Sequence, residues 1–461
     1  LASAYSAAKN GARVILAEDK PRFGGSLLTS DVNIGNQTGV EWAEKIIAEL
    51  KSMPNVTVKN RSQVFGYYDH NMLVMSERIS DHLPKTQKYL PKQRLWYIRA
   101  NEVLISSGSI ERPLVFGNND TPGVMLSSAA KEYMKVYGVL VGKKPLIFTN
   151  NDSGYETAIE FKKNGVNPII LDTRSNPSSD IITEAKNLNI EIRFSYVVVA
   201  AKGYKKVKSA DIAKISDDKK ELFNIENIEC DCICVSGFWT PSIHLASQSG
   251  NKSKFNEKID AFVPDKSKQQ ENTIGSANGI FTLEETIKDA FDKGFDVSNK
   301  ITEKNNKVSV PTVVEKKSTD HDKFWCVPLP KGKSYKRFLD FQNDVAVSDI
   351  ELALREGFRS IEHVKRYTTL GMATDQGKTS NLNGLQLVSD IENKVVPQVG
   401  HTTFRPPYTP VSIGAIVGRE VGKHSKPTRK SPMHSWHEKN NAVFVDAGVW
   451  LRPRYYKQGN E

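Results

Sequence analysis

Residues 144–172 read KPLIFTNNDSGYETAIEFKKNGVNPIILD, and their order of apolar runs, turn and acid is the clearest indication of fold in the sequence. Its opening PLIF run is typical of a strand buried in a parallel sheet. A tight turn around Gly154 leads into a helix expected over residues 155–163, which a glycine terminates. A second apolar strand over residues 167–172 ends in an acid. This order, within about 30 residues, predicts one half of a Rossmann-type unit.

The turn of this unit departs from the usual phosphate-binding pattern. Thr149 and Asn151 stand where the first two glycines of G-x-G-x-x-G would be, and only Gly154 remains. Asparagine tolerates a left-handed backbone, so the turn can form, but the added side chains would crowd a pyrophosphate. We therefore expect this unit to keep the fold without binding a nucleotide in the usual way.

A related pattern opens the chain. Residues 2–8 favour a helix, Asn10-Gly11 ends it, and the apolar run VILA over residues 14–17 predicts a strand followed by Glu18 and Asp19. In a Rossmann unit, an acid at this position accepts hydrogen bonds from ribose hydroxyls. The glycine-rich turn would lie before Leu1, so we expect the chain to be a piece of a longer protein.

Small residues mark the places where backbone could approach a cofactor closely. One double glycine follows the first strand, a second small-residue pair ends an apolar strand over residues 102–108, and a third group precedes a helix expected near Leu283. Backbone amides at such a helix start favour anionic groups. The residues concerned are Gly24, Gly25, Ser26, Ser107, Gly108, Ser276 and Ala277.

Composition limits the classes of function. The chain has 461 residues, 38% hydrophobic and 25% charged, with a net charge of +11. No apolar run approaches the roughly 20 residues that span a bilayer. The lysines are scattered and not interleaved with aromatic residues, so we expect neither a nucleic-acid nor a membrane partner. Cys230, Cys232 and Cys234 alternate without a fourth ligand, so we assign no metal site, and the sparse cysteines favour a reducing cytoplasm.

The pattern predicts an α/β protein with two interleaved Rossmann-like domains of the disulfide-reductase type. A helical segment and the opening of another domain would follow. The expected divisions are 1–143 and 236–300 for the first dinucleotide-binding domain, 144–235 for the second, 301–323 for a low-complexity linker containing a strand at 308–314, 324–400 for a helical segment, and 401–461 for the incomplete last domain.

Four stretches of the chain together resemble the alpha subunit of heterotetrameric sarcosine oxidases. The run 363–378 distinguishes this family from generic pyridine-nucleotide flavoproteins, which would share only the first two stretches. The resemblance covers nearly the whole chain, which we expect to be truncated at both ends. The stretches are 111–113 with 118–120 and 122–125; 148–153; 340–345 with 366–378; and 404–410 with 452–456.

The resemblance implies a reaction divided among subunits. Sarcosine would be oxidised to glycine at FAD on a beta subunit, and electrons would pass through FMN at the alpha–beta interface to oxygen, giving hydrogen peroxide. Tetrahydrofolate would accept the one-carbon unit in an aminomethyltransferase-like α+β domain that starts at residue 401. Residues 324–400 would form a subunit interface, and gamma and delta subunits would complete the assembly. The alpha subunit would hold NAD without redox turnover. We expect no catalytic residue within residues 1–461, so this piece alone should not oxidise sarcosine.

The family's sites carry over to this sequence as two groups. The resemblance implies that Glu18, Asp19 and Ser26 belong to the NAD site, together with Val64 near the adenine, residues 276–283 on the nicotinamide side and Tyr408. A second group would provide a positively charged environment for FMN at the subunit interface, because arginine and lysine suit a phosphate. This second group is Arg366, Thr368, Thr369 and Lys378.

Other functions remain open at this point. A stand-alone disulfide reductase would need a redox Cys-x-x-Cys pair or a complete second glycine turn, and the sequence has neither. The large subunit of an opine or amine dehydrogenase would carry a cysteine-rich segment after the nucleotide domains, where this chain has only Cys326. A non-catalytic, NAD-binding scaffold subunit is the third alternative, and retention of nucleotide after desalting would separate it from the others.

Overall fold

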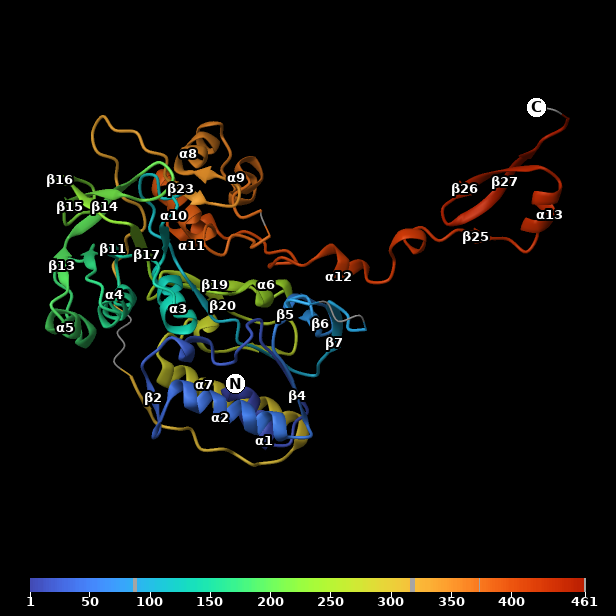
Figure 1. Cartoon of the computed structure of the whole chain (residues 1–461), viewed down its shortest axis with the longest axis horizontal. Helices are drawn as coiled ribbons and strands as arrows, with labels where there is room; N and C mark the ends of the chain where they lie inside the picture. The colour runs from blue at the N-terminus through green and yellow to red at the C-terminus, as the bar shows by residue number, and fades with distance from the viewer. Residues whose placement is uncertain (86–88, 316–319, 373, 460–461) are drawn as a thin grey trace.

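The structure is a computed structural model that describes residues 1–85, 89–315, 320–372 and 374–459. Figure 1 shows the N-terminal unit at the bottom of the view, a second α/β unit at the left, a helical segment above them and a C-terminal hairpin that projects to the right. None of the described helices is long and apolar enough to cross a membrane. The mixed architecture confirms the predicted α/β class.

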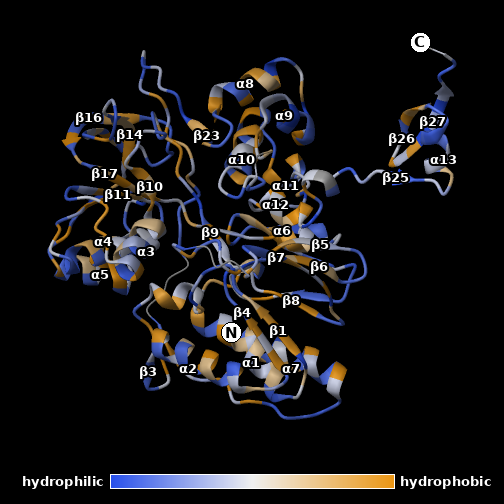
Figure 2. Ribbon diagram, turned by 45° about the vertical axis from the view of Figure 1, so that its right-hand side comes forward, coloured by the Kyte–Doolittle hydropathy of each residue, from blue (hydrophilic) through white to orange (hydrophobic). Residues whose placement is uncertain are grey.

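The N-terminal unit is built on two short parallel strands covered by helices. Its first strand pairs with a later one in the register Val14↔Val56, and it is clearly hydrophobic in Figure 2. Residues 271–302 also belong to this unit. The strand Glu271–Thr273 pairs with the strand Val103–Ile105, and the helix Leu283–Thr302 packs on the helix Ala2–Lys9. The elements are α1 (Ala2–Lys9), β1 (Val14–Ala17), η1 (Gly25–Leu28), β2 (Asn33–Ile34), β3 (Gln37–Thr38), α2 (Gly39–Ser52), β4 (Val56–Lys59), β8 (Val103–Ile105), β21 (Glu271–Thr273), η2 (Gly275–Asn278) and α7 (Leu283–Thr302).

An antiparallel three-stranded sheet follows β4 and carries Val64. The strands are β5 (Ser62–Tyr68), β6 (Met72–Arg78) and β7 (Gln93–Arg99), and Val64 lies opposite Met75. Tyr67 and Leu73 turn their side chains into a small core with Val103 and Leu245. This sheet therefore borders the first unit on the side of the predicted adenine contact.

The second unit is a five-stranded parallel sheet in the order β10-β17-β11-β12-β13. The predicted strand–turn–helix–strand stretch is confirmed as β11, α4 and β12, and β11 is fully buried as its apolar sequence requires. An antiparallel sheet, β14 to β16, packs beside it. The elements are β10 (Val124–Leu126), α3 (Ser127–Tyr137), β11 (Pro145–Thr149), α4 (Ser153–Lys163), β12 (Ile169–Asp172), α5 (Asp180–Asn187), β13 (Glu191–Phe194), β14 (Tyr196–Lys202), β15 (Ser209–Ile215), β16 (Leu222–Glu229) and β17 (Cys232–Ser236).

Two antiparallel crossing strands join the units, and the predicted helical segment packs above them. Its core includes Val364 and Leu385 together with Phe238 and Val263 from the chain after β17. The elements are β9 (Ser109–Glu111), β18 (Trp239–Pro241), α6 (His244–Gln248), β19 (Ser253–Asn256), β20 (Ala261–Pro264), β23 (Phe338–Asp340), β24 (Val345–Ala346), α8 (Val347–Arg355), α9 (Ile361–Thr368), α10 (Asn381–Glu392) and α11 (Val396–Val399).

The last residues form α12 (Ile413–Val417), which contacts β7, followed by η3 (Gly422–His424). A small sheet with one helix comes last and is well separated from the rest in Figure 1. This sheet has the order β25-β27-β26. Its exposed aromatic residues include Trp436 and Trp450. Its elements are β25 (Arg429–Lys430), α13 (His434–Lys439), β26 (Ala442–Ala447) and β27 (Trp450–Tyr456). An aminomethyltransferase-like domain in this region stays a prediction.

The segment predicted as a linker differs from expectation in two ways. The strand expected over 308–314 is reduced to β22 (Val313–Val314), which adds to the edge of β2 and buries Val313. Beyond the gap at 316–319, the backbone oxygens of Asp322 and Phe324 accept hydrogen bonds from Asn150 of the second unit. The described parts of this segment are therefore held against both units, because their backbone groups find partners there.

Candidate functional site

Glu18 lies directly after β1, and its backbone is fixed from both sides. Its N–H donates to the Lys59 oxygen, and its own oxygen accepts from the Ser62 N–H, both at 2.8 Å. One carboxylate oxygen accepts from the Lys20 N–H at 3.0 Å. Burial, with a hydrogen bond to Asp19, raises the pKa of Glu18 to about 7 against the opposing Lys20 N–H. Ribose hydroxyls are donors of the kind that a carboxylate at this position accepts in Rossmann-type units.

The double glycine adopts left-handed backbone conformations. Gly24 has φ 135° and Gly25 has φ 54°, a region that residues with side chains rarely adopt. A Cβ on Gly24 would lie 3.0 Å from the Leu28 side chain, whereas a Cβ on Gly25 would meet nothing within 4 Å. Ser26 follows in η1 and is exposed. This turn is therefore open on the side of Gly25 and Ser26.

The two small-residue stretches that sequence analysis singled out lie side by side. A Cβ on Gly108 would come within 4.0 Å of the Ser276 hydroxyl. The hydroxyl of Ser107 donates to the Ser242 oxygen at 2.7 Å, and the neighbouring Ala277 is fully buried. The N–H of Leu283 donates to the Glu315 carboxylate at 2.5 Å. That amide is occupied within the chain, so Leu283 can reach a ligand only through its side chain.

Tyr408 reaches the first unit from the far end of the chain. It packs in one cluster with Val64 and Leu245. Burial, followed by the charge of Asp19, raises the pKa of Tyr408 to about 12. The structure thus brings three predicted NAD-site residues, Asp19, Val64 and Tyr408, to one region.

The group predicted for FMN is divided by the structure. Arg366 is exposed on α9 and pairs with Glu362 at 3.6 Å. Thr368 donates to the Val364 oxygen at 2.8 Å, and Thr369 ends the helix with φ 66°. The Thr368 hydroxyl is therefore engaged within α9, and Arg366 faces solvent beside Glu362.

Lys378 lies with the NAD-site residues instead. Its ammonium is 4.6 Å from the centre of the Tyr408 ring. Burial lowers the pKa of Lys378, while the charges of Asp375 and Asp19 oppose that shift. The separation arises because the loop after α9 turns back over α6, which local sequence patterns do not encode.

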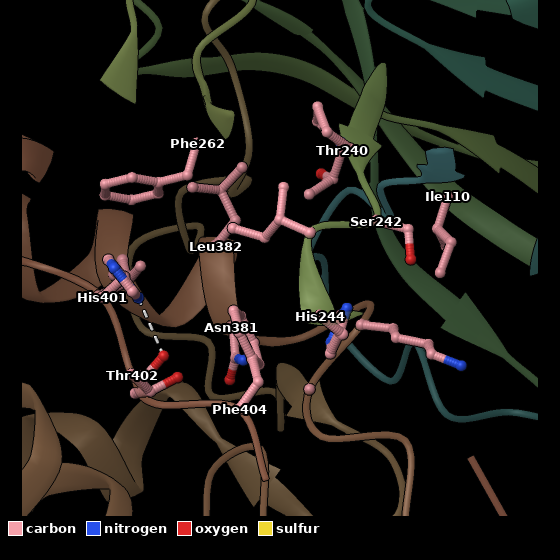
Figure 3. A pocket seen from close by; sticks show the side chains of 15 residues that line it. Ile110, Thr240, Ser242, His244, Phe262, Asn381, Leu382, His401, Thr402 and Phe404 are labelled. Carbon is pink, nitrogen blue, oxygen red and sulfur yellow. Dashed lines mark hydrogen bonds between the residues drawn. The ribbon is translucent and has the colours of Figure 1, made fainter. Parts of the chain in front are cut away.

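Sequence reasoning missed His244, the first residue of α6. Its side chain is 4% exposed and lies between the rings of Phe404, at 4.2 Å, and Tyr408, at 5.3 Å. A small hollow of about 40 Å³ lies beside it (Figure 3). The sequence gives no signal for this histidine, since no motif surrounds it.

In the second unit, the acid that corresponds to Glu18 is Asp172, and side chains of the protein itself contact it. Arg174 donates to both oxygens of Asp172, the acid that ends β12, and its Nη2 lies 2.8 Å from Asp152. Asn151 donates to the oxygen of Ser236 at 3.1 Å. These contacts give a physical reason to expect no nucleotide in this unit, because its acid already has a cationic partner.

The fold defines a class of architecture, the proteins built on two dinucleotide-binding-type units. L-proline dehydrogenase from P. horikoshii superposes with a TM-score of 0.62 at 19% identity, over 90% of this chain and 77% of that chain. This likeness concerns the fold.

The sequence comparisons narrow the class. Residues 334–419 match the sarcosine oxidase A3 domain, a match that crosses the division expected at residue 400. Sarcosine oxidase subunit alpha of Rhizobium meliloti (strain 1021) is 38% identical over 100% of this chain and 45% of its own length. The subunit of Corynebacterium sp. (strain P-1) is 33% identical over 100% of this chain and 48% of its own. The chain is therefore related along its whole length to sarcosine oxidase subunit alpha, and it spans about half the length of these relatives.

Proposed function

We propose that this chain is the nucleotide-holding part of the alpha subunit of a heterotetrameric sarcosine oxidase, with NAD bound beside Glu18. The carrying observation is the partly buried carboxylate of Glu18 at the end of β1, next to the open turn of Gly25 and Ser26. The similarity of this whole chain to about half of the sarcosine oxidase alpha subunits supports the same proposal.

In this proposal each part of the site has a separate task. Glu18 accepts hydrogen bonds from the adenosine ribose, and Asp19 lies next to it. Val64 borders the adenine, and Tyr408 packs behind Val64. The backbone around Gly108 and Ser276 allows close approach of the rest of the dinucleotide. The binding energy of NAD would help to hold the N-terminal unit and the segment around Tyr408 together.

The chemistry of the whole assembly belongs to the same proposal. FAD on the beta subunit would take electrons from sarcosine, FMN at the alpha–beta interface would relay them to oxygen, and tetrahydrofolate would accept the one-carbon unit. Gamma and delta subunits would complete a cytoplasmic assembly. The exposed end of α9 with Arg366, Thr368 and Thr369 is our proposed part of the FMN-side interface, with Lys378 excluded from that group.

The test is to purify the full-length assembly, denature it and quantify the released nucleotide. We expect one NAD per alpha subunit in the wild type and a loss of at least tenfold in Glu18→Ala, because hydrogen bonds to a charged group contribute about 1.5–3 kcal/mol. Glu44→Ala, an exposed acid of α2 that pairs with Arg22, is the matched control and should retain NAD. Equal NAD in Glu18→Ala and wild type would refute the proposal.

A further inference from the structure

The loop that carries the open glycine turn is joined to the second unit by ion pairs. This glycine-turn loop, residues 20–31, belongs to the N-terminal unit and holds Gly25 near its middle. At its start, the ammonium of Lys20 lies 2.6 Å from the carboxylate of Glu132, which is on α3 of the second unit. Figure 1 shows α3 at the border between the second unit and the N-terminal unit.

The other end of the loop makes two further contacts with the second unit. The carboxylate of Asp31 pairs with Lys135 in the last turn of α3 and with Lys163 at the end of α4, the second at 2.7 Å. Burial acts to raise the pKa of Asp31, but hydrogen bonds from the two lysines outweigh it and hold that pKa at about 2. The carboxylate is therefore charged near pH 7, and one acid of the loop is bonded to two helices.

The helices α3 and α4 are also paired with each other. The ammonium of Lys135 lies 3.6 Å from Glu160, and Lys131 pairs with Glu156 one turn earlier on both helices. The Thr157 hydroxyl donates to the first residue of α3 at 3.1 Å. The glycine-turn loop therefore meets α3 and α4 as one joined surface.

Solvent reaches these ion pairs unequally. The side chain of Asp31 is 59% exposed, whereas that of Lys135 is 17% exposed. Each exposed pair contributes little by itself, so the contact depends on having pairs on both sides of Gly25. Dissolved salt weakens such pairs, because the distance over which charges interact falls from about 10 Å at 0.1 M to about 3 Å at 1 M. A contact of this kind is firm at low salt and opens more readily as salt rises.

We infer that Lys20 and Asp31 form an electrostatic latch, which holds the glycine-turn loop against α3 and α4 and slows the release of the dinucleotide. The inference rests on the proposed function, because this loop borders the proposed place of NAD beside Glu18. The dinucleotide leaves past the open side of Gly25, so the loop and the second unit separate first. Lys20 and Asp31 are positioning residues, since their side chains act through the loop.

The experiment uses the full-length assembled protein loaded with NAD and follows the replacement of bound NAD by isotopically labelled NAD. Asp31→Asn should speed up replacement by about threefold to tenfold at low salt, because it removes two ion pairs of modest strength. Raising sodium chloride from about 0.05 M to about 0.5 M should accelerate the wild type by a similar factor and Asp31→Asn by less. Glu44→Gln breaks the pair between Arg22 of the same loop and α2 of the N-terminal unit; it is the matched control and should leave the rate unchanged.

A charge exchange tests whether the contact with the second unit is responsible. Lys20→Glu alone places a second negative charge opposite Glu132 and should accelerate replacement. Adding Glu132→Lys restores an ion pair of reversed direction and should return the rate to near the wild-type value. A double variant as fast as Lys20→Glu would overturn the inference, because Lys20 would then act by some means other than its pair.

A second measurement does not need bound nucleotide. The amides of Leu27, Thr29 and Ser30 donate to backbone oxygens within the loop. Their hydrogen exchange in the NAD-free assembly should be faster in Asp31→Asn than in the wild type or Glu44→Gln, because the loop opens more often. Bound NAD with unchanged replacement rates and unchanged hydrogen exchange in Asp31→Asn would overturn the latch alone. A wild type without NAD would overturn the proposed function and this inference together, so the two failures are distinguishable.

Discussion

The guanidinium of Arg174 forms a two-point ion pair with the carboxylate of Asp172, the last residue of β12 in the second Rossmann-type unit. Nε and Nη2 donate to the two carboxylate oxygens at 3.1 and 2.9 Å, and the Tyr155 hydroxyl donates to the same carboxylate at 2.7 Å. Asp172 is completely buried. An acid that binds ribose in other such units is here a structural group.

Removing this arginine should be costly. Arg174→Met leaves Asp172 and Asp152 buried without their counter-ion, and we expect a loss of about 3–5 kcal/mol in the free energy of unfolding. Asp172→Asn added to that variant should recover part of the loss, because the amide keeps an acceptor for Tyr155. Urea unfolding measures both effects. Arg193→Met, which breaks ion pairs with the exposed Glu191 and Glu226, should cost less than about 1 kcal/mol, and an equal cost for both arginines would contradict this account.

Nucleotide affinity should depend on pH through Glu18. Its pKa of about 7 means that most of the nucleotide-free chain carries a neutral carboxyl at pH 6 and a carboxylate at pH 8. Since ribose hydroxyls bind the carboxylate better, NAD affinity should rise by roughly fivefold to tenfold from pH 6 to pH 8, with release of a proton on binding. Titrations at pH 6, 7 and 8 measure this. The Glu18→Gln variant should bind NAD weakly, with an affinity that does not change with pH. A wild-type affinity that is also independent of pH would contradict this role of Glu18.

Glu111 should make the stability of the chain pH-dependent. Burial raises the pKa of Glu111 to about 7, although the Ser236 hydroxyl and the Ser128 N–H favour the carboxylate. The folded chain therefore holds a proton that the unfolded chain releases near 4.5, so this contribution to stability declines as pH rises from about 4.5 to 7. The whole change amounts to about 3 kcal/mol.

The Glu111→Gln variant isolates that effect. Glutamine keeps an acceptor for the Ser128 N–H and cannot ionise, so the variant should gain stability relative to wild type at pH 8 and not at pH 5. Urea unfolding at the two pH values provides the comparison. Glu229→Gln, a surface acid paired with Lys144, should show no such difference, and parallel pH profiles for wild type and Glu111→Gln would rule out the assignment.

The contact between α1 and α7 depends on Gly294. A Cβ there would lie 2.4 Å from the backbone oxygen of Ser3, which cannot move away without shifting the helix. Gly294→Ala should therefore destabilise the first unit by about 1–3 kcal/mol. Gly414→Ala in α12 meets nothing within 4 Å and should be neutral or gain up to about 1 kcal/mol. Thermal unfolding compares the two variants, and the idea fails if they behave alike.

Local chemistry was enough to predict several elements. The apolar runs of β11 and β12 form strands because burial of consecutive apolar side chains suits a parallel sheet, and α4 ends where Gly165 adopts φ 78°. The apolar run of β1 also forms a strand, although its side chains are only partly buried and Ile15 is exposed. The place of Glu18 after β1 follows from the same pattern.

Contacts between distant parts of the chain were beyond such reasoning. Lys378 was assigned to the neighbourhood of Arg366, but its ammonium lies over Tyr408, near Asp19. The strand expected over 308–314 contracted to β22, because only Val313 and Val314 find a partner strand in β2. Neither result could be predicted from helix or strand propensity, because propensity reflects neighbouring residues in the sequence and not tertiary contacts.

The two Rossmann-type units and the place of Glu18 directly after β1 follow from the local sequence, because strands, helices and turns depend on residues a few positions apart. Which side chains share a site was decided only when α6 and the loop before α10 packed together. That packing buries His244 between Phe404 and Tyr408 and lowers the pKa of Lys378. Burial and electrostatic coupling depend on distances in space, and residues hundreds of positions apart in sequence acquire those distances only on folding.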